Sequence, residues 1–174
     1  ERERFEPPAV PLAQPGGPAI AVPGIEAPPG AAETTLVIRQ IRIVGATVYT
    51  PAQLAQLYAD LIGKKVTLQA VYDLAQHITA KYGADGYVLS RAIVPPQQLT
   101  PGGATVRIKV IEGYVDRVEW PAVLSTYKDF FSEYTAKIIA DRPSNIRTIE
   151  RYLLLAGDLP GLKFKNTLKP STTE

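Results

Sequence analysis

Hydrophobic residues between positions 36 and 112 recur with two periods, and each change of period marks a new expected element. Two stretches are rich in β-branched residues that alternate with polar ones, which predicts strands, and a third such run is stopped by Pro95 and Pro96. Two other stretches carry apolar side chains three and four positions apart, which is typical of helices with one buried face. The expected elements are, in order, a strand at 36–44, helices at 51–62 and 68–82, and strands at 87–94 and 104–112.

The same pattern restarts after residue 113, with a period near 80 residues. A strand is followed by two amphipathic segments and a second strand, after which the sequence stops before a third strand. The second unit is therefore expected to lack its last strand. Its expected elements are a strand at 114–120, helices at 125–139 and 145–156, and a strand at 162–168.

Connectivity restricts how the strands of one unit can pair. The second and third strands are joined closely enough to form an antiparallel hairpin, and the third runs in the same direction as the first. Both pairings are satisfied by the order 1-3-2. We therefore expect an α+β fold of two tandem domains, each with a three-stranded mixed sheet covered by two helices, in which the second strand is an edge. In the second domain the missing strand is the central one.

The first 35 residues have a different composition from the rest. Eight of the 16 prolines fall within residues 1–32, together with four glycines. Proline removes backbone donors and disfavours a helical conformation in the residue before it. We expect residues 1–35 to be an extended, semi-rigid linker. A proline-rich ligand for a recognition module is the alternative, since Pro8 and Pro11 have the P-x-x-P spacing. The domains are then residues 36–113 and residues 114–174.

Composition removes several classes of chemistry. Cysteine is absent and His77 is the single histidine, which excludes thiolate metal sites, cysteine nucleophiles and multi-histidine zinc sites. No paired-carboxylate motif, phosphate loop or metal-ligand spacing is present, so we expect no enzyme activity and no cofactor. Residues 33–174 hold 17 basic and 13 acidic residues, which favours weak, salt-sensitive attraction to an acidic partner.

Four motifs occur together in order and spacing. The first three are Ile41–Gly45, Gly86–Gln97 and Val110–Val115, and the fourth, Glu150–Gly161, reads ERYLLLAGDLPG. This set strongly resembles the POTRA (polypeptide-transport-associated) domains of the TpsB family of outer-membrane transporters. These are members of the Omp85 superfamily that act in two-partner secretion, similar to the secretors of haemolysin and filamentous haemagglutinin. The resemblance covers residues 36–174.

The resemblance implies a function in protein transport. A periplasmic pair of POTRA domains would bind an unfolded TpsA-type exoprotein in extended form through its N-terminal secretion domain. The pair would then deliver it to the protein's own C-terminal outer-membrane barrel, which is absent from this sequence. Nucleic acid and small-molecule substrates are not expected. The alternative is a POTRA scaffold of an outer-membrane assembly or cell-division protein, with the same fold and fixed protein partners.

The expected edge strand supplies the candidate site. Such a strand leaves backbone amide and carbonyl groups unpaired, and an extended client segment can pair with them by β-augmentation, whatever its sequence. Arg91 interrupts this strand, and we weigh three roles for it: a solvated edge charge, an ion pair with Glu112 or another acid, and a contact to the exoprotein. The candidate partner-binding residues are Tyr87, Val88, Leu89, Ser90, Arg91 and Ala92.

Overall fold

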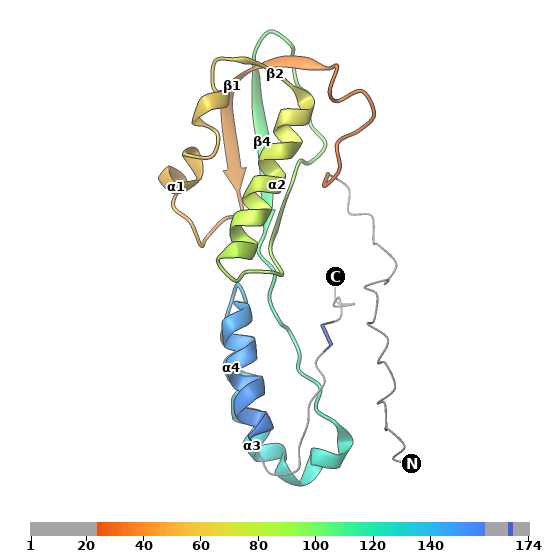
Figure 1. Cartoon of the computed structure of the whole chain (residues 1–174), viewed down its shortest axis with the longest axis vertical. Coiled ribbons are helices and arrows are strands. Elements are labelled where there is room, and N and C mark those ends of the chain that lie inside the picture. The colour runs from red at the N-terminus through yellow and green to blue at the C-terminus, as the bar shows by residue number, and fades with distance from the viewer. Residues whose placement is uncertain (1–23, 159–166, 169–174) are drawn as a thin grey trace, which may run out of the picture.

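The structure is a computed structural model that describes residues 24–158 and 167–168. Figure 1 shows two units arranged along the long axis of the molecule, with a sheet and a long helix in the first and two helices in the second. The expected strand at 162–168 lies almost entirely outside the described residues, as does the part of the proline-rich stretch that precedes residue 24.

The first unit contains a four-stranded sheet in the order β2-β1-β4-β3. Strand β1 pairs in parallel with β4, and β4 pairs antiparallel with β3, so these neighbours are the ones that connectivity predicts. The elements of this unit are β1 (Thr35–Val44), α1 (Pro51–Ala55), a 3₁₀ turn at Ala59–Leu61, β2 (Lys65–Thr67), α2 (Leu68–Ala84), β3 (Arg91–Ile93) and β4 (Ala104–Ile111).

The expectation of three strands is wrong, because β2 adds a fourth strand beside β1. Its residues pair antiparallel with Thr35–Val37. The chain is turned back towards β1 at Gly63, whose amide donates to the carbonyl of Ile38 over 2.7 Å. Gly63 has φ +76°, a left-handed conformation that favours glycine. Lys65–Thr67 is too short for a hydrophobic period to reveal it.

The first expected helix is shorter than its apolar spacing indicates. Thr50 and Gln53 form a capping box at its start, with each side chain bonded to the backbone of the other residue. The α-helix nevertheless ends at Ala55, and Tyr58 leaves the helical region with φ −131° before the 3₁₀ turn begins. Helix α2 therefore covers most of the sheet face, where two helices were expected (Figure 1).

The core of the first unit lies between α2 and one face of the sheet. The buried positions of β4 alternate strictly with exposed ones, as its sequence pattern predicts. Tyr82, near the end of α2, is fully buried and makes edge-to-face contacts with the rings of Tyr49 and Tyr87. The side chains with no exposed surface are those of Ile38, Val71, Ile78, Tyr82, Val106 and Ile108.

The second unit consists of helices among the described residues. They are a 3₁₀ segment (Ala122–Tyr127), α3 (Lys128–Ala140) and α4 (Ile146–Gly157). Leu124, Phe131 and Ala156 form its small core, against which Trp120 packs with its ring 4.6 Å from that of Phe131.

The strand expected at residues 114–120 is not formed. No neighbouring strand lies beside it among the described residues, so its backbone has no ladder to join. The amide of Val115 instead donates to the hydroxyl of Ser144 over 2.9 Å.

Candidate functional site

The six candidate residues begin in a turn and end in an edge strand. The strand expected at 87–94 is only three residues long, because the amide of Ser90 donates to the carbonyl of Tyr87 and closes a turn over Val88 and Leu89. Gly86, with φ +96°, lies just before this turn, where the chain leaves the end of α2. Arg91 and Ala92 belong to β3, which lies at the edge of the sheet as expected. The sequence therefore locates the edge but overestimates its length.

Burial separates the six residues into exposed and structural groups. Val88 is half exposed, whereas Ser90 and Ala92 are buried. The Ser90 hydroxyl accepts a hydrogen bond from the amide of Gly113 over 3.1 Å. Arg91 forms no ion pair within the described residues, and its buried Nε atom has no hydrogen-bond partner there. The Arg91–Glu112 pair that we considered is thus not found.

The outer edge of β3 is less open than the sequence indicates. The amides of Ser90, Ala92 and Val94 all donate to groups outside the strands of the sheet. The amide of Ala92 donates to the hydroxyl of Thr79 on α2 over 2.9 Å, and the amide of Val94 donates to the carbonyl of Gly24 over 2.9 Å. A client strand that pairs along this edge must therefore replace some of these bonds or use the remaining carbonyl groups.

Residues 24–34 of the expected linker lie against the first unit. Ala31 is 2% exposed, and its carbonyl accepts from the amide of Gln69 in the first turn of α2. The carbonyl of Thr34 accepts from the amide of Leu68 over 2.7 Å. This segment therefore caps the N-terminal end of α2 and reaches the end of β3.

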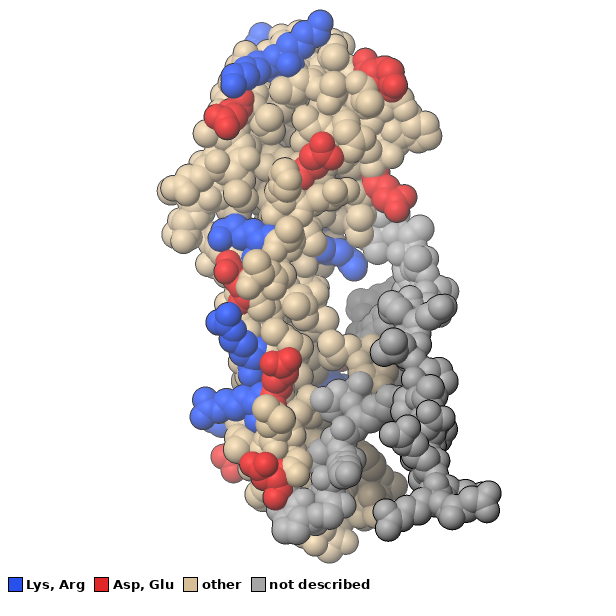
Figure 2. All heavy atoms as spheres, viewed as in Figure 1, with Lys and Arg blue, Asp and Glu red and all other residues tan. Residues whose placement is uncertain are grey.

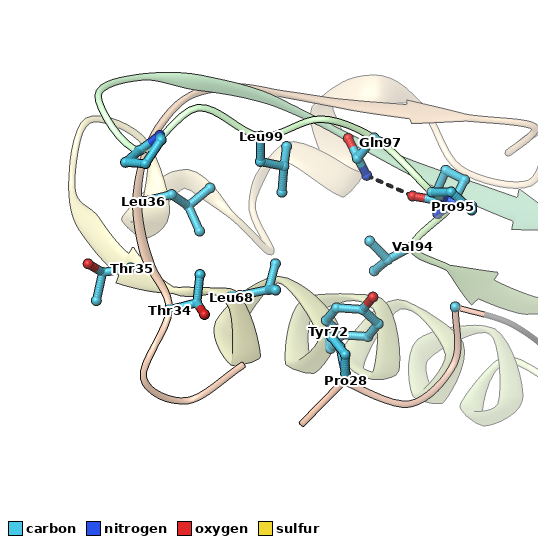
Figure 3. Close-up of a pocket in the computed structure, with 13 residues that line it drawn as sticks. Pro28, Thr34, Thr35, Leu36, Leu68, Tyr72, Val94, Pro95, Gln97 and Leu99 are labelled. Atoms are coloured by element: carbon cyan, nitrogen blue, oxygen red, sulfur yellow. Dashed lines mark hydrogen bonds between the residues drawn. The ribbon is translucent and has the colours of Figure 1, made fainter. Parts of the chain in front are cut away.

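An open cavity of about 420 Å³ lies between this segment, the start of α2 and the loop that follows β3. Figure 3 shows Leu68 and Tyr72 of α2 facing Val94 and Leu99 across it. The lining is mainly apolar and includes several prolines. Such a groove suits the apolar side chains of an extended peptide. We refer to it as the α2 groove; its lining residues are Gly24, Pro28, Thr34, Thr35, Leu36, Leu68, Tyr72, Val94, Pro95, Pro96, Gln97, Leu99 and Pro101.

Glu112 fixes the opposite end of the first unit. One carboxylate oxygen accepts from the amide of Thr47 at 2.6 Å, the amide of Val48 at 3.1 Å and the hydroxyl of Tyr82 at 2.7 Å. The other oxygen accepts from the Thr47 hydroxyl. Burial opposes ionisation of Glu112, but these hydrogen bonds outweigh it and lower the pKa of its carboxyl below the ordinary value.

The two units meet at the N-terminus of α4. Asn145 caps that helix and its side-chain amide also donates to the carbonyl of Asp85 over 3.0 Å. The amide of Ile146 donates to the carbonyl of Gly86, and the amide of fully buried Ser144 donates to the carbonyl of Gly113. The turn before the candidate residues is therefore tied directly to the second unit.

Sequence reasoning missed several of these contacts. Thr79 is a polar residue beside the buried face of α2. This position is the one local signal that its hydroxyl could accept a hydrogen bond from the neighbouring strand, as it does from the amide of Ala92. Residues 24–34 gave none, because proline content indicates an extended chain but not where that chain docks. Among the described residues, no cluster of acidic or histidine side chains could hold a metal ion, and no helix is long and apolar enough to cross a membrane.

Comparison with known proteins places this fold in a family. A family model described as "POTRA domain, ShlB-type" matches residues 36–113. The heme/hemopexin transporter protein HuxB of Haemophilus influenzae is 26% identical over 111 residues, which are 63% of this chain and 19% of HuxB. The chain thus spans about a fifth of the length of the curated relatives it matches.

Solved structures show the same fold. CdiB from Escherichia coli superposes with a TM-score of 0.67 and 21% identity, over 94% of this chain and 28% of CdiB. The N-terminal domain of Omp85 from the cyanobacterium Thermosynechococcus elongatus gives a TM-score of 0.50 and 20% identity, over 71% of this chain and 55% of that one. Residues 36–113 therefore match a POTRA domain of the ShlB type, the type found in the TpsB family of transporters. This family consists of transporters rather than enzymes.

Proposed function

We propose that this chain is the periplasmic POTRA region of a two-partner secretion transporter. It binds the N-terminal secretion domain of an unfolded TpsA-type exoprotein and delivers it to the outer-membrane barrel of the same protein. Residues 36–113 and 114–174 would act as two consecutive POTRA domains. The observation that supports this most is an edge strand that lies beside an open apolar groove in a TpsB-type POTRA domain.

The client would bind in extended form along residues 87–92 and continue into the α2 groove. Backbone pairing accepts many sequences, which suits an unfolded client. Since the amides of Ser90, Ala92 and Val94 already have partners, pairing there gains little net hydrogen bonding. Burial of client side chains in the α2 groove must then supply much of the affinity. One buried leucine contributes about 2 kcal/mol, so modest affinity is expected.

Replacing Tyr72 with alanine tests this proposal. Tyr72 lines the α2 groove and is half-buried where the groove meets the core, so its loss removes apolar contact area from the groove. We expect Tyr72→Ala to weaken binding of an unfolded exoprotein secretion domain about tenfold, measured by calorimetric titration of the full chain. His77→Ala is the matched control, because His77 is exposed on the same helix and does not line the groove.

Two outcomes would contradict the proposal. If the wild-type chain bound no secretion domain, a scaffold with fixed partners would be the better account. If Tyr72→Ala and His77→Ala bound the client equally, the client would use another surface. Circular dichroism of both variants establishes that each one is folded.

A further inference from the structure

The open face of the sheet, opposite α2, carries basic residues without acidic ones. The alternation of buried and exposed positions places residues of three strands on this face. In the view of Figure 2, by contrast, acidic and basic side chains are interspersed along the molecule. We refer to the basic set as the basic face; it consists of Arg39 and Arg42 on β1, Arg107 and Lys109 on β4, and Arg91 on β3.

Strand register brings two of these charges side by side. Arg42 is the direct partner of Arg107 in the parallel pairing of β1 with β4. Both are exposed, and none of the five basic residues forms an ion pair within the described part of the chain. Like charges in directly opposite positions destabilise a sheet. A bound anion would remove this repulsion and form charge-assisted hydrogen bonds with the guanidinium groups.

The two arginines border a concave site. Arg42, Thr105 and Arg107 form its floor, and the loop of residues 96–98 forms a wall, enclosing about 360 Å³. Gln97 holds this loop in place, because its side-chain amide both accepts from the Arg107 amide and donates to the Arg107 carbonyl, each over 2.8 Å. The same two bonds fix the backbone that carries the Arg107 side chain.

We propose that the basic face binds an acidic, extended polypeptide segment whose carboxylates meet Arg42 and Arg107. This inference rests on the proposed function, since it assigns a chemistry to part of the client, but it uses a surface separate from the α2 groove. Arg107 and Lys109 lie two residues apart on one strand, about 7 Å. An extended peptide with acidic residues at alternate positions repeats its charges at the same spacing.

The concave shape favours a peptide over a membrane surface. A flat bilayer contacts protruding lysines and arginines, whereas a side chain can enter a cavity that has a wall on one side. Three of the four basic residues on β1 and β4 are arginines, whose planar donors match a carboxylate in two parallel hydrogen bonds.

Two labelled peptides provide the test: eight residues of alternating Glu and Thr, and the same length of alternating Gln and Thr. Binding to the full chain is followed by fluorescence anisotropy at low salt. We expect the Glu peptide to bind and the Gln peptide not to. Arg42→Gln with Arg107→Gln should weaken Glu-peptide binding about tenfold. Lys128→Gln with Lys137→Gln removes the same charge at two exposed positions on α3, in the second unit, and should change binding less than about twofold.

The outcomes separate this inference from the proposed function. Equal loss in both double variants, or equal binding of both peptides, would overturn the basic-face site. The chain could instead bind phosphatidylglycerol vesicles through Arg42 and Arg107 and bind neither peptide. A membrane would then be the ligand of the basic face, and the peptide site would be overturned. A secretion domain that binds wild type and the Arg42/Arg107 variant equally would also overturn it, while the proposed function stands. Peptide binding without secretion-domain binding would support the site and contradict the proposed function.

Discussion

Replacing Gly45 with alanine is expected to lower the free energy of unfolding by more than about 3 kcal/mol. Gly45 follows β1 with φ +85°, where a side chain is strained. A Cβ atom there would also stand 2.3 Å from the carbonyl oxygen of Val110, a backbone atom of the neighbouring strand β4. The ends of β1 and β4 would have to separate, which disturbs the loop that reaches Glu112. Urea unfolding followed by circular dichroism measures the loss.

Gly63→Ala is the matched control. Gly63 has φ +76°, but a Cβ atom there meets no other atom within 4 Å. Its substitution therefore adds backbone strain without a clash, at a cost of about 1 kcal/mol. If both variants lost the same free energy of unfolding, the close approach of β4 would not explain why position 45 requires glycine.

Replacing Glu112 with alanine is expected to cost about 3–5 kcal/mol. The change leaves two amides and two hydroxyls, from Thr47, Val48 and Tyr82, without their shared acceptor. Burial, together with the bond to Glu112, raises the pKa of the Tyr82 phenol, so this group remains a donor that needs an acceptor. Glu33→Ala, at an exposed site, should change the stability by less than about 0.5 kcal/mol. Equal losses would contradict the role of Glu112.

The same carboxylate predicts a pH dependence. Because the pKa of folded Glu112 lies below its ordinary value of 4.5, the unfolded chain binds a proton first as the pH falls. The stabilisation is fully present above that value and is lost as the pH falls through the lower pKa of the folded protein. Glu112→Gln cannot titrate, so the stability difference between wild type and this variant should shrink from pH 6 to pH 3. A difference independent of pH would contradict this reading.

Local signals predicted the elements whose stability is local. Thr50, Thr67 and Asn145 cap helices and are residue types that favour this position, and the alternating residues of β4 are buried and exposed in turn. The pairing of β1 with β4 and of β4 with β3 followed from chain direction alone. These features depend on neighbours in sequence or on connectivity, both of which a single sequence contains.

Features that depend on distant contacts were not predictable in the same way. Lys65–Thr67 becomes a strand because Thr35–Val37 lies beside it, and residues 24–34 are held by α2. Of the candidate site, the edge position of β3 was predicted, but its shortness and the bond from Ala92 to Thr79 were not. That bond joins residues 13 positions apart, and no periodicity encodes it. The α2 groove likewise exists only once three separate segments have met.

Site-specific crosslinking tests the central claim, capture of an extended client in the α2 groove, most directly. The chain contains no cysteine, so a single introduced cysteine can carry a photoreactive benzophenone at one known position. Labels at Tyr72→Cys and Leu99→Cys lie in the groove, and a label at His77→Cys lies on α2 outside it. With an unfolded exoprotein secretion domain, we predict strong crosslinks from the two groove positions and background yield from His77→Cys. Equal yields from all three positions would contradict the account.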